Sequence, residues 1–440
     1  MMLKRILISS CLCMLPFFGF AQKVEHVILV SIDGFRPDFY RDSHWPTPNL
    51  KMLAENGVSA DEVRTIFPSV TYPSHTTLIT GVLPEKHGIY YNTIIKDDGS
   101  PGGWVYDFAE IKSRTLWQAA KEKDLKTASV SWPVSVDSPF IDYNIPEFWS
   151  FTDPLDRREA TSEHANPKGL FEEVVKNATG DLSKNEYNLT SLRMDQNLGR
   201  IATYILEKYK PNFLSLHLPN LDGAEHANGR ESQEVSRAIA GADLVVGQIY
   251  NALKREKMLE NTVIIVTGDH GFVSTHTSIS PNLWLKDMGL ENEAFFFSAG
   301  GSAFLHITGK NENKIVETVK SGLANLPLAQ QEMFRLVSLE EIQKMQSDPR
   351  VKLAISAKEG FSFSNEKEGE LLQKKKGGKH GYFPDFYNIY TGFVASGAGL
   401  AENQKIQHMQ LEDVAVIIAK LLDLDMPQAS GIMYPGILAE

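Results

Sequence analysis

Apolar residues gather along the chain in short, nearly continuous runs. The first is VEHVILVSID, from Val24 to Asp33. Four similar runs follow it: Thr127–Trp132, Phe213–Leu218, Thr262–Asp269 and Tyr387–Gly397. Runs of this length and continuity are typical of strands that are buried on both faces of a parallel sheet.

Between these runs, apolar residues recur every three or four positions, which predicts amphipathic helices. One stripe consists of Val235, Ile239, Ala242, Val246, Ile249 and Leu253, and a second of Leu411, Val414, Ile418 and Leu421. Strands that alternate with such helices predict an α/β fold, a doubly wound and mostly parallel sheet flanked by helices on both faces.

Two stretches fit the alternation poorly, residues 138–192 and 309–378. We expect them to be insertions over the edge of the sheet that carries the active site. Residues 22–440 are therefore predicted to form one catalytic domain, in which the lysines at 374–376 lie in a solvated loop.

The segment 1–21 is predicted to be a signal peptide. It has a basic start, an apolar run, and the small residues Gly19 and Ala21 before Gln22. A lipid anchor on Cys11 is the weaker alternative. Both cysteines of the chain lie in this segment, so we expect no thiol chemistry in the remainder. The protein is predicted to be exported, either periplasmic or secreted, and no other apolar stretch reaches the roughly 20 residues of a transmembrane helix.

The charge balance limits the classes of partner. The 440 residues include 44 Lys and Arg against 55 Asp and Glu, a formal net charge of −11. An acidic chain without a basic stripe argues against a nucleic-acid-binding surface. It does not exclude a small phosphate ester as substrate, because bound metal ions can reverse the local charge.

Carboxylates follow several of the predicted strands, at the sheet edge where open α/β folds bind ligands. They are Asp33, Asp222 and Asp269, and three histidines accompany them in sequence, His226, His270 and His380. An aspartate after a strand often only caps a helix, and a single histidine is more often structural. Their repeated occurrence at strand ends favours a metal site, and carboxylate with imidazole suits zinc or a similar ion.

A nucleophile is predicted in the segment FPSVTYPSHTTLITG. Pro73 suits the first turn of a helix, so Thr71 lies at a helix N-terminus, where free N–H groups favour an oxyanion or phosphoryl group. A divalent metal would favour the alkoxide of this threonine. The segment alone also allows Thr71 to be a simple helix cap. Other hydroxyls compete with it on chemistry alone: Ser69, Ser74, Thr76 and Thr77.

The chain resembles the nucleotide pyrophosphatase/phosphodiesterase family of the alkaline phosphatase superfamily. Six stretches carry the resemblance, in the order of the family: VSIDGFRPDFY, FPSVTYPSHTTLITGVLPEKHGIYYN, SVSWPVS, LDGAEHANG, TGDHGF and KHGYFPD. The resemblance implies an alkaline-phosphatase-like sheet and a centre with two Zn²⁺ per chain. It also implies hydrolysis of phosphodiester or phosphoanhydride bonds of small substrates, through a phospho-threonine intermediate.

The resemblance implies two ligand sets. The first ligand set is Asp33, Asp269 and His270, with Thr71 facing its zinc as nucleophile and ligand. The second ligand set is Asp222, His226 and His380.

The same resemblance makes Asn92 a hydrogen-bond donor to a phosphoryl oxygen and Tyr72 an aromatic side chain of the leaving-group pocket. A second aromatic could be Tyr143, Phe148 or Trp149, of which we predict Tyr143 to bind substrate. The remaining histidines, His75 and His217 among them, are expected to be structural.

Two departures from the family pattern concern substrate choice. LPNLD stands where the family has Glu-Pro-Asp, and Trp-Pro-Val stands where it has Trp-Pro-Gly. An alkaline phosphatase-type phosphomonoesterase of the same superfamily, which shares the threonine, the asparagine and both metals, is the alternative function. We find no Lys-x-Arg near the Trp-Pro segment, which favours the diester. A catalytically inactive exported binding protein is a further alternative, and it predicts the loss of at least one metal ligand.

Overall fold

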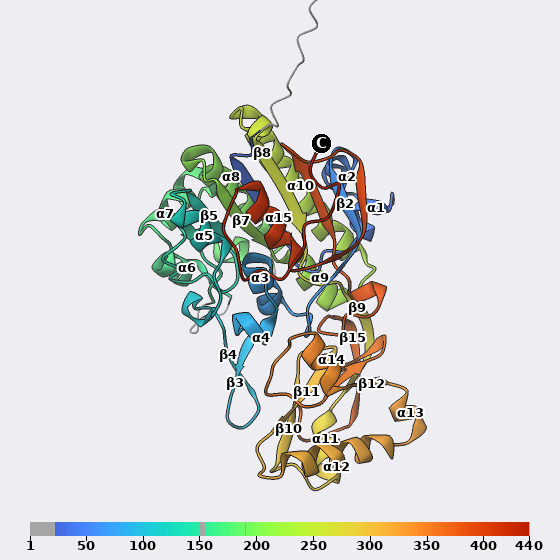
Figure 1. The fold of residues 1–440 in the computed structure, drawn as a ribbon. Coiled ribbons are helices and arrows are strands. Elements are labelled where there is room, and N and C mark those ends of the chain that lie inside the picture. Colours follow the sequence, from blue (N-terminus) through green and yellow to red (C-terminus); the bar gives the residue numbers. More distant parts are fainter. Residues whose placement is uncertain (1–22, 150–152, 154, 190, 440) are drawn as a thin grey trace, which may run out of the picture.

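The structure is a computed structural model that describes residues 23–149, 153, 155–189 and 191–439. The predicted signal peptide therefore lies outside the described residues. An eight-stranded sheet forms the centre of the upper body of the molecule (Figure 1). The strand order is β17-β2-β16-β8-β1-β7-β5-β6. In chain order the strands are β1 (His26–Ile32), β2 (Val58–Arg64), β5 (Thr127–Val130), β6 (Tyr143–Ile145), β7 (Phe213–Leu218), β8 (Thr262–Thr267), β16 (Phe393–Gly397) and β17 (Gln404–Gln410).

The pairing confirms the predicted mostly parallel sheet. β1 is parallel to both of its neighbours, β7 and β8, and β16 is antiparallel to β8 and β2. Each of the five predicted apolar runs contributes a strand, and these five strands are adjacent in the sheet.

Helices cover both faces of the sheet, as predicted. On β1, Ile28 and Val30 face one apolar core and Val27 and Leu29 face the other. The first core is closed by α2 (Pro48–Glu55), α7 (Leu170–Val174), α8 (Arg193–Tyr209), α9 (Asn220–Asn228) and α10 (Gln233–Arg255). The second is closed by α3 (Thr71–Thr80), α5 (Leu116–Glu122) and α15 (Asp413–Leu421). Three further helices are α1 (Asp38–Arg41), α4 (Pro84–His87) and α6 (Arg158–His164).

A lower lobe hangs below this body in Figure 1 and has an apolar core of its own. It contains two small sheets, ordered β10-β11-β13-β12 and β14-β9-β15. Its strands are β9 (Val273–Ile279), β10 (Ala294–Ser298), β11 (Ser302–Ile307), β12 (Phe334–Val337), β13 (Ala354–Ala357), β14 (Gly360–Phe363) and β15 (Leu372–Lys379). Its helices are α11 (Pro281–Asp287), α12 (Glu312–Ala324), α13 (Leu328–Gln331) and α14 (Leu339–Lys344).

The lysines at 374–376 do not form the predicted loop. They belong to β15, which pairs antiparallel with β9, and their side chains are exposed. Lys374 lies opposite Thr277, and Lys375 and Lys376 form an irregularity in the strand before Gly377 lies opposite Thr275. Pairing on both sides of the irregularity thus outweighs the polar composition.

A hairpin joins the two parts of the molecule. It consists of β3 (Thr93–Ile95) and β4 (Pro101–Trp104) and reaches from the upper body toward the lower lobe. At its tip Gly99 has a φ of +78°, and a Cβ there would lie 2.6 Å from the ring of Phe295 on β10. Only glycine fits this turn and this approach.

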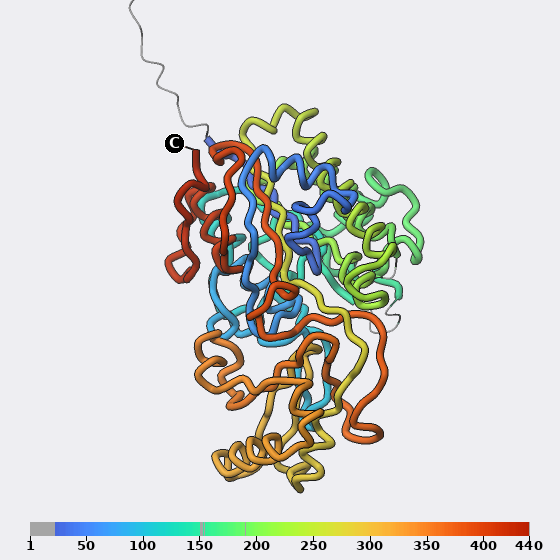
Figure 2. The backbone as a smooth tube through the Cα atoms, turned by 90° about the vertical axis from the view of Figure 1, so that its right-hand side faces the viewer, coloured from blue at the N-terminus to red at the C-terminus, as the bar shows by residue number. Residues whose placement is uncertain are grey.

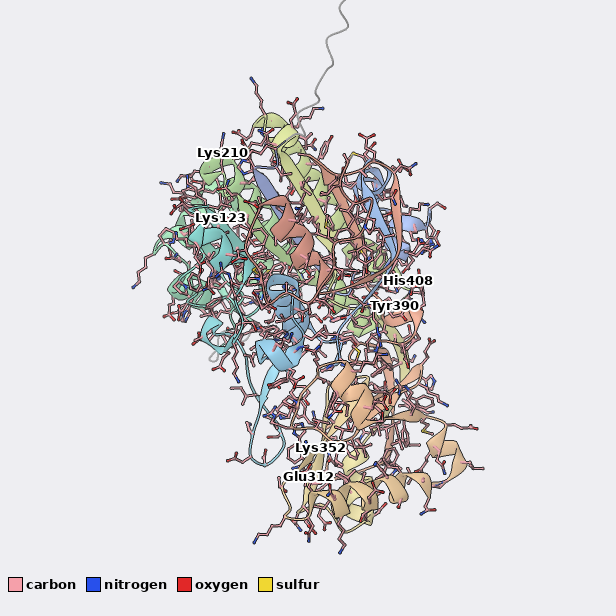
Figure 3. The ribbon with its side chains drawn as sticks, in the orientation of Figure 1. Lys123, Lys210, Glu312, Lys352, Tyr390 and His408 are labelled. Atoms are coloured by element: carbon pink, nitrogen blue, oxygen red, sulfur yellow. The ribbon has the colours of Figure 1, made fainter. Side chains whose placement is uncertain are left out.

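Charged side chains extend over the surface of both parts (Figure 3). Among those labelled, Lys352 and Glu312 approach to 3.9 Å in the lower lobe, and Lys210 pairs with Glu256 at 3.0 Å in the upper body. Exposed pairs of this kind contribute about 0–1 kcal/mol each. The fold therefore depends on its apolar cores.

The tube in Figure 2 shows the C-terminus beside the beginning of the described chain, at the end of the upper body away from the lower lobe. Within the described residues, no helix has the length and apolar character that crossing a membrane requires.

Candidate active site

Three aspartates meet where the central strands end. Asp33 follows β1, Asp269 follows β8, and Asp222 lies in the first turn of α9, which follows β7. Because β1 pairs in parallel with both β7 and β8, with Ile32 opposite Leu218 and Ser31 opposite Thr267, the three strands end at one edge.

The three predicted histidines lie among these carboxylates. His226 Nε2 is 3.3 Å and His380 Nε2 is 3.6 Å from Oδ1 of Asp222. His270 Nε2 is 3.4 Å from Oδ1 of Asp33. His226 follows Asp222 by one turn of α9, whereas His380 comes from the end of β15 in the lower lobe.

Two overlapping groups could each hold a metal ion, with ligand atoms within 4.8 Å of one another. One is the second ligand set, Asp222, His226 and His380; the other is Asp33, Asp222 and His270. Asp269 belongs beside the latter group, since its Oδ2 lies 3.1 Å from His270 Nε2. Its Oδ1 accepts hydrogen bonds from the N–H groups of Gly34 and His270, which fixes the carboxylate. The structure thus brings the six predicted carboxylate and imidazole ligands together and gives Asp222 a position common to both groups.

The hydrogen bonds of the histidines fix which nitrogen can bind a metal. The Nδ1 atoms of His226, His270 and His380 lie 2.9–3.1 Å from the backbone oxygens of Gly378, Gly271 and Ser69. A carbonyl oxygen only accepts, so each Nδ1 carries a hydrogen, and Nε2 is the nitrogen that each ring directs toward the carboxylates.

In this arrangement, carboxylate oxygens and imidazole nitrogens that can only accept hydrogen bonds face one another without a donor between them. Buried atoms without a hydrogen-bond partner include Oδ1 of Asp33, Oδ1 of Asp222, Oδ2 of Asp269 and Nε2 of His270. Buried polar atoms are rarely left unsatisfied, and cations placed between these atoms would satisfy all of them. The donor set of carboxylates and imidazoles fits zinc.

The electrostatics of the site agree with a requirement for cations. Burial, together with the charge of neighbouring carboxylates, raises the pKa values of Asp33 and Asp269 well above the usual range. Burial lowers the pKa of His270, and that of His380 to about 3, so both rings are neutral and available as ligands. Burial alone would raise the pKa of Asp222, but His226 and His380 hold it below its usual range.

Thr71 is the first residue of α3, and the segment before it reaches the site: Ser69 O lies 2.9 Å from His380 Nδ1, and Val70 lines a cavity together with His226 and His380. Three of its predicted competitors hold structural hydrogen bonds. The Ser69 hydroxyl bonds to the backbone of Tyr382 and Gly381, the Thr76 hydroxyl donates to the Tyr72 carbonyl, and that of Thr77 contacts His87. The fourth competitor, Ser74, is fully buried without such a bond.

Asn92 is held against the same helix end. Its Oδ1 accepts a hydrogen bond of 2.9 Å from the backbone N–H of Tyr72. The amide is thereby oriented so that its Nδ2 is left to donate to a ligand.

A cavity of about 250 Å³ opens beside the second ligand set. His226, His380 and Asn92 contribute to its wall, together with Trp104 of the hairpin and Lys379 of β15. Two candidate metal ligands, an amide donor, an indole and a lysine therefore share one small space.

Tyr72 packs against Trp104, one of the residues that line the cavity. Its side chain is fully buried, and its ring centroid lies 5.1 Å from that of Trp104. Trp149 stacks on Trp104 with centroids 5.4 Å apart, and Phe148 packs on Tyr106.

The structure does not bring Tyr143 to the site. Its ring stacks on Tyr209, at the end of α8, with centroids 3.9 Å apart. Tyr143 begins the edge strand β6 opposite Ala128, in the first half of β5, and so lies away from the strand ends that carry the metal ligands. Of the three predicted aromatics, Phe148 and Trp149 are the ones near Tyr72 and Trp104.

Sequence reasoning missed Trp104, Lys379, His217 and Glu147. The neighbour of Lys379 in sequence, His380, was the available signal for the lysine. The hairpin that presents Trp104 has no apolar pattern to reveal it. His217 and Glu147 are 70 residues apart and meet only through the parallel packing of β5, β6 and β7.

Comparison with known proteins agrees with this geometry. The sequence profile of the type I phosphodiesterase/nucleotide pyrophosphatase family matches residues 27–383. Venom phosphodiesterase 2 of Crotalus adamanteus is 24% identical over 94% of this chain and 47% of its own length. Ectonucleotide pyrophosphatase/phosphodiesterase family member 7 of Rattus norvegicus is 23% identical over 95% of this chain and 87% of its own length. The chain spans about half the length of the first curated relatives it matches.

Solved structures share the fold. Murine ectonucleotide pyrophosphatase/phosphodiesterase 5 superposes with a TM-score of 0.68, at 21% identity, over 92% of this chain and 97% of the murine chain. An inactive variant of that murine protein, solved in complex with AMP, superposes equally well at 20% identity, over 93% of this chain and 97% of its own.

Proposed function

The chain belongs to the type I phosphodiesterase/nucleotide pyrophosphatase family, and we propose that it is an exported two-zinc hydrolase that cleaves phosphodiester or phosphoanhydride bonds of small substrates. One observation carries the proposal: six carboxylate and imidazole side chains converge, with unsatisfied ligand atoms, beside the helix that Thr71 begins. Export is inferred from the signal-peptide pattern of residues 1–21.

The two ligand sets would hold the two ions. When bound, the zinc ions would supply the positive charge that polarises a phosphoryl group and stabilises negative oxygens. The first ligand set would lie next to Thr71, and the second beside the cavity that Asn92 and Trp104 line.

Thr71 would act as the nucleophile. Its deprotonated Oγ1 forms a bond to phosphorus, and the bond from phosphorus to the leaving-group oxygen breaks, with the electron pair going to that oxygen. Water then forms the new bond to phosphorus and releases the Thr71 hydroxyl. The N-terminus of α3 and the Asn92 Nδ2 hydrogens stabilise the phosphoryl oxygens in both steps.

The cavity indicates the size and character of the substrate. A space of about 250 Å³ with an indole on one wall suits a small ester with a planar or apolar leaving group. The AMP complex of the murine relative supports a nucleotide as one such substrate.

Lys379 favours the alternative function, a phosphomonoesterase. This lysine lines the cavity within 3.5 Å of the His226 ring, and a cation there suits the additional negative charge of a monoester. The same lysine would also suit the second phosphoryl group of a phosphoanhydride.

Rates on matched substrates test the proposal. The zinc-loaded protein should hydrolyse thymidine 5′-(p-nitrophenyl) phosphate faster than p-nitrophenyl phosphate, which has the same leaving group. The variant Lys379→Met should change the rate on the monoester more than that on the diester. A faster rate on the monoester would replace the proposed function by the alternative, and no hydrolysis of any ester by a protein that holds zinc would support the inactive binding protein.

A further inference from the structure

A line of buried polar side chains runs from the first ligand set to the wall of the cavity. Oδ2 of Asp33 lies 3.1 Å from Nε2 of His217. Nδ1 of His217 lies 3.0 Å from Oε2 of Glu147, and the Tyr72 hydroxyl donates to Oε1 of Glu147 at 2.9 Å. The four side chains, which we call the buried link, are at most 4% exposed as residues.

At the first end of the buried link, Asp33 contacts His217 through the carboxylate oxygen that does not face His270. Asp33 turns Oδ1 toward His270 and the metal-ligating atoms, and it turns Oδ2 toward His217. The bond to His217 therefore fixes the rotation of the carboxylate without occupying the oxygen that would ligate. Such outer partners of metal ligands orient the ligand and increase metal affinity.

The other end fixes the aromatic wall. The bond from Tyr72 to Glu147 holds the ring that packs against Trp104, and the backbone N–H of Tyr72 holds Asn92. A displacement of Glu147 would therefore reach both the indole of the cavity and the amide that faces the substrate.

A purely structural role does not account for these residues. His217 lies on β7 between Leu216 and Leu218, and its ring packs against that of His75 with centroids 4.4 Å apart; an apolar side chain there would leave no polar group to satisfy. Burying an imidazole and a carboxylate costs free energy that their hydrogen bonds only offset. His217 differs from the candidate ligands, because the Ser131 carbonyl and Glu147 share its Nδ1 and its Nε2 is directed at an oxygen that does not face the other ligands.

We propose that His217 and Glu147 are positioning residues that tie the orientation of Asp33 in the first ligand set to the position of Tyr72 behind the substrate wall. This inference rests on the proposed function, which gives Asp33 and the cavity their roles. The link makes metal affinity and leaving-group binding interdependent, although the two sites use different residues.

Three variants test the link at its middle and at one end. His217→Phe removes the hydrogen bonds to Asp33, to Glu147 and to the Ser131 carbonyl and keeps an aromatic ring at the position. Glu147→Gln keeps the shape and one acceptor, and Tyr72→Phe removes only the hydroxyl. His87→Phe is the matched control, since His87 on α4 is equally buried and its ring bonds to Thr77 and to the backbone N–H of Ile89 instead of to the link.

The measurements are zinc affinity by competition with a chromogenic chelator, and separate kcat and KM values on thymidine 5′-(p-nitrophenyl) phosphate. His217→Phe should weaken the zinc of the first ligand set by about 10–100-fold, lower kcat and raise KM. Tyr72→Phe should raise KM several-fold and weaken the same zinc by a smaller factor, because coupling through the link acts in both directions, and Glu147→Gln should change both. The double variant His217→Phe/Tyr72→Phe should raise KM by less than the product of the single effects, because the first change already frees the second residue.

The outcomes separate the inference from the proposed function. If His217→Phe binds zinc as tightly as the unmodified protein and loses only thermal stability, as His87→Phe does, the positioning role is overturned. Independent effects of His217→Phe and Tyr72→Phe on KM would also overturn it. Failure of the unmodified protein to bind zinc would overturn the proposed function and the inference with it, whereas zinc binding without hydrolysis would overturn only the catalytic role.

Discussion

The two ligand sets differ in how the fold holds them. The side chains of Asp33, Asp269 and His270 in the first set are at most 6% exposed, whereas those of Asp222, His226 and His380 are 19%, 29% and 10% exposed. The first set follows strands at the centre of the sheet. The second combines one helix of the upper body with one strand end of the lower lobe.

The sheet alone can therefore position the side chains of the first ligand set, whereas the second ligand set forms only when the lower lobe packs against the upper body. The contact between the two parts is close: Gly377 of β15 has a φ of +119°, and a Cβ there would lie 2.1 Å from the backbone oxygen of His226. The first set should therefore resist perturbation better than the second.

The largest expected effect separates chemistry from metal binding at the first set. Thr71→Ala should lower kcat by at least about 1,000-fold, because the nucleophile is lost, and should leave zinc content unchanged. Steady-state rates and metal analysis measure both. Thr80→Val is the control, because Thr80 is a buried threonine at the other end of α3 and should keep near-normal rates. A Thr71→Ala protein with a normal rate would refute the nucleophile assignment.

The second prediction compares the two sets directly. A chelator should remove zinc from the unmodified protein in two phases, the faster from the second set, with rates that differ by about tenfold or more because solvent reaches that set. His226→Ala should abolish the fast phase. Asp269→Asn should abolish the slow phase, since the amide oxygen can still accept from Gly34 and His270 but carries no charge. Release in a single phase from the unmodified protein would show that the two sets are equivalent.

The third prediction acts on docking without removing a ligand. Gly377→Ala should push β15 away from α9 and weaken zinc binding at the second set by about tenfold, while the first set is unaffected. The chelator assay measures this. Gly241→Ala in α10 is the control, because a Cβ there meets no neighbour within 4 Å. Equal weakening at both sets would contradict the independence of the first set from the lower lobe.

The smallest expected effect concerns the support of α9. Asp195 on α8 accepts a hydrogen bond of 3.2 Å from the N–H of Asn220, and burial raises its pKa to about 7. The folded protein therefore holds a proton on Asp195 at pH values where the unfolded chain has already released it. The free energy of unfolding should thus decrease as the pH rises from about 4 to 7.

Asp195→Asn should remove this loss and raise the free energy of unfolding by about 1 kcal/mol at pH 8, with little gain at pH 4. Denaturant unfolding of the zinc-free protein at both pH values measures the difference. An equal change at the two pH values would show that the carboxyl does not titrate in this range.

The sequence patterns predict the sheet and the convergence of six carboxylate and imidazole side chains, for a physical reason. Buried parallel strands need continuous apolar runs, and residues that follow such runs must lie at one edge, so Asp33 and Asp269 could be placed together from pattern alone. His226, His380 and Asn92 needed the family resemblance as well, because no predicted parallel strand ends directly before them and their positions stay open.

The cavity wall could not be predicted in this way. Trp104 is presented by an exposed hairpin, and Tyr143 looked similar to Phe148 and Trp149 until its strand was seen to start at the other end of β5. Lys379 and the lysines at 374–376 belong to a strand whose pairing, rather than its composition, decides its conformation. Side chains that meet only through tertiary packing leave no local signal.

The origin of the second ligand set has a consequence for the biogenesis of the protein. Asp33 comes from the first strand of the sheet, but His380 is added only after the lower lobe has been synthesised and has folded back against α9. Contacts between such distant parts of a chain form late and slowly. Binding of the full complement of metal ions should therefore be one of the last events in maturation. The ions would stabilise a fold that has already formed and would not initiate its folding.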